Sequence, residues 1–186
     1  MSSLNADTVW RELIRAGADR RHPWRVVALC TQAQAGPQAR HLILRQVIPD
    51  ERRLLFYTDR RTPKLREIED CPRVALLMWD PGHRRQLRAT GQAGLLEDPA
   101  AVKRRWAAIP EAARRDYATV AAPGTAMPAG SSGPAVDLAL ATQHFSVLSV
   151  QVQRLEWLEL GGQRHQRIVL SWEAAGQSWQ AQDLVP

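Results

Sequence analysis

Hydrophobic and polar residues alternate over most of the chain, which predicts a protein built mainly from β-strands. Strand-like runs are expected at 25–32, 39–48, 52–58, 73–79, 85–96, 145–157, 164–172 and 178–184. Helical spacing is expected at 7–17, where Asp7 is the candidate cap, at 62–70, and at 98–118 with an interruption at Pro110. Short turns between the strands favour antiparallel pairing, because parallel neighbours need a longer crossover. The pattern predicts a mainly β fold, an antiparallel barrel with helices packed outside it.

The chain of 186 residues is expected to form a single domain over 1–186, with a mobile loop at 121–134 that is rich in Pro, Gly, Ala and Ser. Its 45% hydrophobic and 24% charged content is that of a globular protein, which excludes disorder. No apolar run is long enough for a membrane span, and the first residues lack a secretory pattern. Cys30 and Cys71 are isolated, which fits a cytoplasmic protein and predicts no metal site.

The formal charge of +6 leaves a nucleic-acid-binding role open. All the basic residues except Lys64 and Lys103 are arginine, which also fits a compositional bias. The arginines are scattered along the sequence instead of forming one stripe, and this argues against nucleic acid as the partner. The two commonest glycine-rich nucleotide loops are absent from the sequence.

The most informative stretch begins the helix expected at 62–70. Thr62 is a candidate N-cap and Pro63 suits the first helical position, so the helix begins beside a strand end. Arg60, Arg61 and Lys64 gather there, although cations are unfavourable near a helix N-terminus. The mismatch indicates an anionic ligand such as a phosphate, and the alternative is a solvated basic turn.

Three further stretches carry candidate polar groups. The strand 40–45 has an arginine at each end, either for a ligand at the barrel mouth or simply at the surface. Gln86 lies on a polar strand face that either lines a pocket or meets solvent. A two-residue turn at Gly161-Gly162 would place Trp157 and Arg167 on opposite faces of the hairpin, whereas a three-residue loop at 161–163 would pair them directly. As a pair, they would either flank a flat anionic ligand or form a surface cation–π contact.

Taken in order, these stretches resemble the pyridoxamine 5'-phosphate oxidase family, the FMN-binding split β-barrel group. The matching segments run Arg40-His-Leu-Ile-Leu-Arg45, Phe56-Tyr-Thr58, Thr62-Pro-Lys64, Ile68-Glu-Asp-Cys-Pro-Arg-Val74, Arg85-Gln-Leu87, Trp157, His165-Gln-Arg-Ile-Val169 and Leu184-Val-Pro186. The resemblance covers most of 25–186. It implies a split barrel of the Greek-key type that binds FMN where the two subunits of a homodimer meet.

The same resemblance implies roles for individual residues. Arg40, Thr62 and Lys64 would hold the FMN phosphate. The ribityl chain and ring would contact Tyr57, Thr58, Gln86 and the backbone groups of His41, Leu42 and Ile43, with Trp157 and Arg167 reaching the flavin from the final hairpin. Arg45 and His165 would face a small-molecule substrate. No catalytic residue is assigned by the sequence.

The resemblance implies an FMN-dependent oxidoreductase or oxidase, but the substrate positions differ from the oxidase pattern. Gln163 stands where the oxidase has an arginine, and Arg45 replaces a lysine. The substrate, the electron acceptor and the pathway are therefore left open. The alternatives are a non-catalytic flavin or haem carrier on the same barrel, and a basic nucleic-acid-binding domain without a cofactor.

Overall fold

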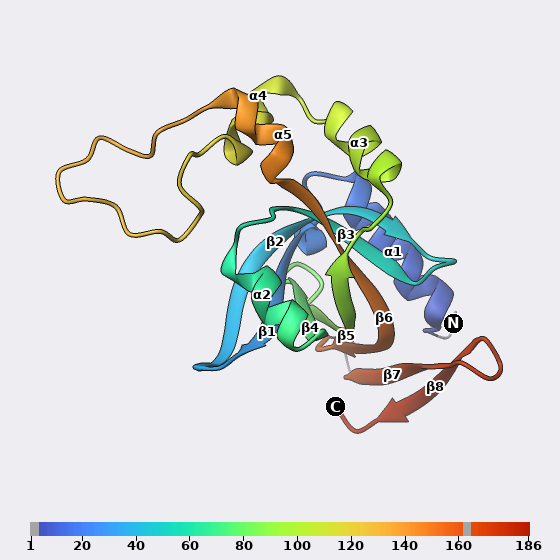
Figure 1. Cartoon of the computed structure of the whole chain (residues 1–186). Coiled ribbons are helices and arrows are strands. Elements are labelled where there is room, and N and C mark those ends of the chain that lie inside the picture. The colour runs from blue at the N-terminus through green and yellow to red at the C-terminus, as the bar shows by residue number, and fades with distance from the viewer. Residues whose placement is uncertain (1–3, 162–164) are drawn as a thin grey trace.

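The computed structural model describes residues 4–161 and 165–186 (Figure 1). Its helices are α1 (Ala6–Ala18), α2 (Pro63–Asp70), α3 (Pro99–Ala107), α4 (Glu111–Arg114) and α5 (Ala141–His144), with single 3-10 turns at Pro23–Arg25, Arg115–Tyr117 and Leu138–Leu140. Its strands are β1 (Val26–Ala33), β2 (Gly36–Ile48), β3 (Arg53–Asp59), β4 (Arg73–Asp80), β5 (Arg85–Leu95), β6 (Phe145–Glu159), β7 (Gln166–Glu173) and β8 (Ser178–Leu184). Every strand predicted from the alternating pattern is present.

All eight strands belong to one sheet in the order β3-β2-β1-β4-β5-β6-β7-β8. A further pairing of β3 with β6 closes the first six of these strands into a barrel, and β7 and β8 extend the sheet beyond it (Figure 1). Each pair of neighbouring strands is antiparallel. The predicted fold class, a mainly β antiparallel barrel with flanking helices, is confirmed.

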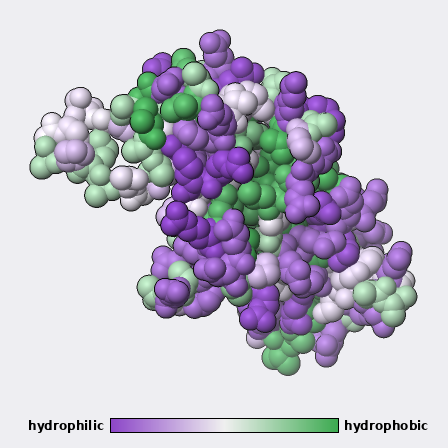
Figure 2. Space-filling view, in the orientation of Figure 1, coloured by the Kyte–Doolittle hydropathy of each residue, from purple (hydrophilic) through white to green (hydrophobic). Residues whose placement is uncertain are grey.

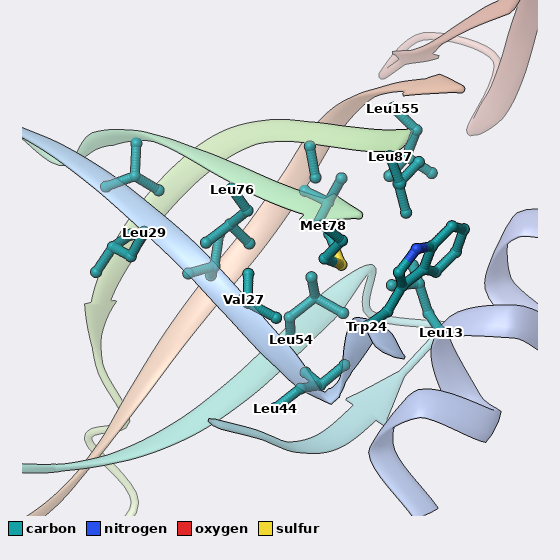
Figure 3. Close-up of a cluster of buried hydrophobic side chains, with 14 of the residues drawn as sticks. Leu13, Trp24, Val27, Leu29, Leu44, Leu54, Leu76, Met78, Leu87 and Leu155 are labelled. Atoms are coloured by element: carbon teal, nitrogen blue, oxygen red, sulfur yellow. The ribbon is translucent and has the colours of Figure 1, made fainter. Parts of the chain in front are cut away.

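The interior of the barrel is filled by the inward-facing residues at alternate positions along the strands β1 to β6 (Figure 3). Figure 3 shows this core with Leu13 of α1 and Trp24 packed among strand residues, including Leu29, Leu44 and Leu87. These side chains are fully buried, and each contributes about 1.5–3 kcal/mol through burial. Helix α1 therefore covers one end of the barrel with its apolar face.

A second apolar cluster lies on the outward side of β3 and the start of β6. Tyr117 and Trp106 pack around Phe145, with ring centroids 5.3 Å away in both cases. The segment from α3 to α5 carries these aromatic residues across the sheet. The sequence predicts one helix over residues 98–118 with an interruption at Pro110. In the structure this segment forms α3, α4 and a 3-10 turn, and α3 ends before Pro110.

The pairing of β5 with β6 requires a glycine at position 91. The pairing of these strands shifts register between Thr90 and Gly91. A Cβ added at Gly91 would lie 2.0 Å from the carbonyl oxygen of Gln151, so only glycine fits there. This close approach allows the long β6 strand to pair with β3 over its first half and with β7 over its second half.

The cap of α1 differs from the prediction, whereas the 121–134 segment is irregular, as the sequence indicates. Asn5, not Asp7, caps α1, because its side chain accepts a hydrogen bond from the backbone N–H of Thr8 at 3.0 Å. The 121–134 segment contains no helix or strand, and it projects away from the barrel in Figure 1. A bridge between Thr119 and Val136 closes its base.

Neither a membrane-spanning helix nor a metal-binding cluster occurs among the residues that the structure describes. In that part of the chain, none of the helices has both the length and the apolar character needed to cross a bilayer. Within 4–161 and 165–186, there is likewise no group of three or more histidine, cysteine or acidic side chains that could hold a metal ion.

Candidate functional site

The end of β3 and the start of α2 form the centre of the candidate site. Pro63 is the first residue of α2 and Thr62 is its N-cap residue, as predicted. The Thr62 side chain makes no capping hydrogen bond; its hydroxyl donates to the carbonyl oxygen of Asp59 at 2.8 Å. Leu65 and Ile68 are buried and fix the helix against the barrel. The helix start is therefore held rigidly beside the last residues of β3.

Lys64 extends from the first turn of α2 toward β3. Its ammonium nitrogen Nζ donates to the hydroxyl of Thr58 at 2.8 Å and to that of Thr62 at 2.7 Å. Burial, followed by the neighbouring Arg40, lowers the pKa of Lys64 to about 8, whereas Asp59 and Glu67 oppose the shift. No carboxylate in the described part of the chain lies within ion-pairing distance of this ammonium. Lys64 is thus a half-buried cation with only hydroxyl partners.

Arg40 reaches the same region from β2. Its guanidinium donates to the hydroxyl of Thr31 and to the Glu67 carboxylate, the latter at 2.8 Å. The Thr31 hydroxyl in turn donates to Glu67. These three residues belong to β2, β1 and α2, so they connect the helix to two neighbouring strands. We call the set of Arg40, Thr31, Thr58, Thr62, Lys64 and Glu67 the β2–α2 cluster.

Arg60 and Arg61, predicted to gather with Lys64, have other roles. The Arg61 guanidinium pairs with Asp59 at 2.7 Å and donates to the carbonyl oxygens of Thr119 and Val120 at 2.9 and 3.0 Å. Burial raises the pKa of Asp59, but the hydrogen bonds from Arg61 outweigh it and hold the pKa below its usual value. Arg61 therefore fastens the base of the 121–134 segment, whereas Arg60 is exposed and lines a recess beside α3.

The remaining predicted residues of β2 divide between the two faces of the strand. Leu42 is buried in the core, whereas His41 and Arg45 are exposed on the outward face, where Ile43 is half-buried. The Arg45 guanidinium lies over the ring of Tyr57, 5.4 Å from its centroid. The structure therefore brings two of the predicted flavin and substrate residues together on the outward side of β2 and β3.

The predicted pairing of Trp157 with Arg167 is wrong. Trp157 lies opposite Ile168, and Arg167 lies opposite Leu158. The ladder ends at the pair of Glu159 with Gln166, so the connection has six residues and not three. A shift of one residue changes the face of the sheet, which places Trp157 and Arg167 on opposite sides.

Trp157 packs inside the barrel against Trp24, with ring centroids 5.3 Å apart, and only 3% of it is exposed. The two residues Gly162 and Gln163 of the predicted loop, together with Arg164, lie outside the described residues. His165 precedes β7 and is exposed.

Arg167 belongs to a second charged group on the outward face of β5, β6 and β7. Glu156 is surrounded by Arg88, Arg154 and Arg167 at 3.3, 3.6 and 2.6 Å. Burial raises the pKa of Glu156, but the hydrogen bond from Arg167 and the other arginines lower it further than burial raises it. One carboxylate faces three guanidinium groups, so this surface keeps an excess of positive charge. The half-buried Gln86 lies on the same face, two residues before Arg88.

The predicted site residues thus fall into two groups within one chain. Among the described residues, no hydrogen bond or ion pair joins the β2–α2 cluster to Gln86 or Arg167. Helix α2 and strand β7 also lie well apart in Figure 1. Thr31 and Glu67 were missed from the sequence. Glu67 had a usable signal, because it lies three residues after Lys64 on one helix face, whereas Thr31 had none.

An exposed apolar strip follows the outward face of β1 and β4. Val26, Leu77 and Trp79 are 46%, 40% and 44% exposed. The register places Leu77 beside Ala28 on the neighbouring strand, so the strip is continuous across both strands. Large apolar side chains grouped in this way are typical of a surface that contacts another protein.

A separate recess of about 520 Å³ lies between α3, α5 and the ends of β5 and β6. Leu96, Trp106, Phe145 and Val147 form apolar walls, and Arg60 also lines it. Figure 2 shows an apolar area surrounded by hydrophilic residues in this region of the molecule. Pockets of this size and character bind small molecules in other proteins. None of the residues expected to contact a flavin lines this recess.

The β2–α2 cluster fits the phosphate end of a nucleotide-like cofactor. Lys64 offers a positive charge without a carboxylate partner, Arg40 adds further N–H donors, and the hydroxyls of Thr58 and Thr62 lie beside them. Lysine and arginine form the strongest hydrogen bonds that a protein makes to phosphate oxygens.

Comparison with known families agrees with this geometry. Residues 7–97 match the family described as "Pyridoxamine 5'-phosphate oxidase, FMN-binding domain". Together with the closed antiparallel barrel, this match defines the class of protein: residues 7–97 carry the FMN-binding domain of the split-barrel family related to pyridoxamine 5'-phosphate oxidase. FMN is the cofactor of that family domain.

Particular relatives extend the comparison. Pyridoxine/pyridoxamine 5'-phosphate oxidase from Rubrobacter xylanophilus is 39% identical over 85 residues, which are 46% of this chain and 37% of that protein. The chain therefore matches only a little over a third of its curated relative's length. A pyridoxamine 5'-phosphate oxidase-related, FMN-binding protein from Nostoc punctiforme has a similar structure, with a TM-score of 0.80, 23% identity and full coverage of both chains.

Two more distant structures share the fold alone. PhzG from Burkholderia lata, solved with tetrahydrophenazine-1-carboxylic acid, gives a TM-score of 0.68 at 19% identity, covering 97% of this chain and 91% of that one. A haem-binding protein from Mycobacterium smegmatis gives 0.53 at 18% identity, covering 90% and 59%. The same barrel thus occurs in proteins with different ligands.

Proposed function

We propose that the chain forms an FMN-binding homodimer that acts as a flavin-dependent oxidoreductase. The observation that carries this proposal is the half-buried Lys64 ammonium, held by two hydroxyls and lacking a carboxylate partner among the described residues. Burial of a charge is costly unless a partner compensates for it. A phosphate group bound beside Lys64 and Arg40 would provide that compensation.

The phosphate of FMN would lie against Lys64, Arg40 and the hydroxyls of Thr58 and Thr62. The N-terminus of α2 points to the same place and adds partial positive charge. From there, the ribityl chain and ring would follow β2 along His41, Leu42 and Ile43 toward Tyr57. This path would run along the outward face of β2, where His41 and Ile43 lie, toward Tyr57 of β3, and Leu42 would contribute only its backbone groups.

Gln86 and Arg167 would reach the flavin from a second copy of the chain. They lie on a different surface from the β2–α2 cluster within one chain, so one site can include both groups only if two copies combine. The exposed strip of Val26, Leu77 and Trp79 lies between these surfaces on β1 and β4, and burying it would stabilise the dimer. A homodimer with a flavin in each of two equivalent seams satisfies both requirements.

The bound flavin would supply the electron-transfer chemistry, and the chain would supply binding, orientation and charge. Arg45 and His165 are exposed near the proposed ring position and the final hairpin, and they would face a small-molecule substrate. Arg167 would stabilise negative charge on the reduced ring. The proposed setting is the cytoplasm.

The test is reconstitution of the full chain with FMN, followed by an assay of oxygen consumption with pyridoxine 5'-phosphate and pyridoxamine 5'-phosphate. The proposal expects a yellow protein with flavin absorbance. It also expects that the protein oxidises one of these two compounds and that oxygen is consumed as it does so. Flavin binding without turnover of either compound would reject these substrates. A colourless protein that takes up haem, or one that binds DNA in a strongly salt-dependent manner, would contradict the proposal itself.

A further inference from the structure

Glu67 lies between the two cations of the β2–α2 cluster. It follows Lys64 by three residues on α2, so both side chains leave the same face of the helix. Its carboxylate pairs with Arg40 at 2.8 Å, and no ion pair in the described part of the chain joins it to Lys64. Glu67 therefore neutralises one cation directly and acts on the other only at longer range.

Building on the proposed FMN site, we propose that Glu67 is a positioning residue for the phosphate: it fixes the Arg40 guanidinium in place and limits the positive charge around it. Neither the sequence pattern nor the family resemblance predicts a role for Glu67. It requires that the phosphate bind where Arg40 and Lys64 converge.

Positioning follows from the hydrogen bonds of Arg40. The guanidinium has two fixed acceptors, the Thr31 hydroxyl and the Glu67 carboxylate, and Thr31 is itself held by Glu67. The side chains of Arg40 and Glu67 are 25% and 12% exposed, so this triad is mostly shielded from water. A long arginine side chain held in advance loses less entropy when a ligand binds. The remaining N–H groups of Arg40 stay available for a phosphate oxygen.

Charge limitation follows from a comparison of the groups around the site. Asp59 is matched by Arg61, which leaves Arg40 and Lys64 opposed by Glu67 alone. The cluster thus keeps one excess positive charge while Lys64 is protonated, and would have two without Glu67. A phosphate monoester carries about −1.5 to −2 at pH 7, so the carboxylate weakens its attraction. The two effects of Glu67 on phosphate binding therefore have opposite signs, and substitutions can separate them.

The experiment compares Glu67→Gln with Glu67→Ala in the full chain, stripped of flavin and titrated with FMN and with riboflavin. Glutamine keeps an acceptor for Arg40 but loses the charge, so FMN is expected to bind about 2- to 10-fold more tightly than to the wild type. Alanine also loses the acceptor, so FMN is expected to bind at least ~10-fold more weakly than to the glutamine variant. Riboflavin lacks the phosphate and should bind all three proteins alike.

A pH series provides a readout that a purely structural role would not move. The groups facing the Lys64 ammonium are Arg40 on β2, Asp59 on β3 and Glu67 on α2, with the hydroxyls of Thr58 and Thr62. Glu67 raises the pKa of Lys64, so its removal lowers that pKa. The alkaline decline of FMN affinity should therefore begin at a lower pH in Glu67→Gln than in the wild type.

Glu69→Gln is the matched control, because Glu69 is an exposed residue of the same helix and should leave every value unchanged. The inference is overturned if the two Glu67 variants keep the wild-type ratio of FMN to riboflavin affinity and the wild-type pH profile. It is also overturned if both variants lose FMN and riboflavin equally, which indicates general damage to the fold. Failure of the proposed function is a separate result, in which the wild type itself binds no FMN.

Discussion

Replacing Lys64 with methionine should remove most of the affinity for FMN while leaving the affinity for riboflavin intact. The ammonium lies 2.7 and 2.8 Å from the hydroxyls of Thr62 and Thr58, and its charge has no direct carboxylate partner in the described part of the chain. A hydrogen bond to a charged group contributes about 1.5–3 kcal/mol. Its loss therefore predicts FMN binding that is weaker by about 10- to 150-fold.

The assay is a titration of flavin-free protein with each flavin, followed by quenching of flavin fluorescence. Lys103→Met is the matched control, because Lys103 is the other lysine of the chain and is exposed on α3. It should bind FMN as the wild type does. The reasoning is refuted if Lys64→Met keeps wild-type FMN affinity, or if it loses FMN and riboflavin to the same extent.

The remaining predictions concern pH, stability, assembly and packing. With the pKa of Lys64 at about 8, the affinity for FMN should stay level up to about pH 8 and then fall by up to about tenfold per pH unit as the ammonium loses its proton; equilibrium dialysis across pH checks this, and a flat profile would count against Lys64. The folded-state pKa lies below the unfolded value, so the charged Lys64 lowers stability below about pH 8 and this penalty disappears as pH rises toward the unfolded value. Lys64→Met should therefore raise the unfolding free energy of the flavin-free protein at pH 7 by about 1–2 kcal/mol, after allowance for solvent screening, and urea denaturation showing a loss instead would be incompatible with it. Leu77→Asp should shift the protein toward monomers in analytical ultracentrifugation without unfolding it, because this side chain is 40% exposed in the single chain; an unchanged dimer would place the seam elsewhere. Gly91→Ala should destabilise the fold by about 2 kcal/mol or more, since its Cβ would meet the Gln151 carbonyl oxygen, and an unaltered melting temperature would disprove that contact.

Local patterns in the sequence were sufficient to predict the barrel. Alternating apolar residues located each strand, and the Thr62-Pro63 pair located the start of α2, because both signals depend on neighbouring residues alone. The 3-10 turn at 138–140 and the four-residue α5 were not predicted, since elements this short show no periodicity. Asn5 caps α1 in place of Asp7 because two capping-type residues only two positions apart give equivalent signals in the sequence.

The candidate site could be predicted only in part, because its residues meet through tertiary contacts. The sequence grouped Arg61 with Lys64, yet Arg61 pairs with Asp59 and with carbonyl oxygens 58 and 59 residues away. Carbonyl oxygens so far from Arg61 along the chain cannot be recognised as its partners from the sequence. The pairing of Trp157 with Arg167 was mispredicted because a loop length was assumed, and one residue of register reverses the faces of a strand.

Native mass spectrometry of the full chain after incubation with FMN tests the central claim most directly. The account predicts a species with the mass of two chains and two FMN molecules, and the same dimer with no flavin retained when riboflavin replaces FMN at equally low concentration. A single chain without bound FMN, under conditions in which the protein is folded, would contradict it.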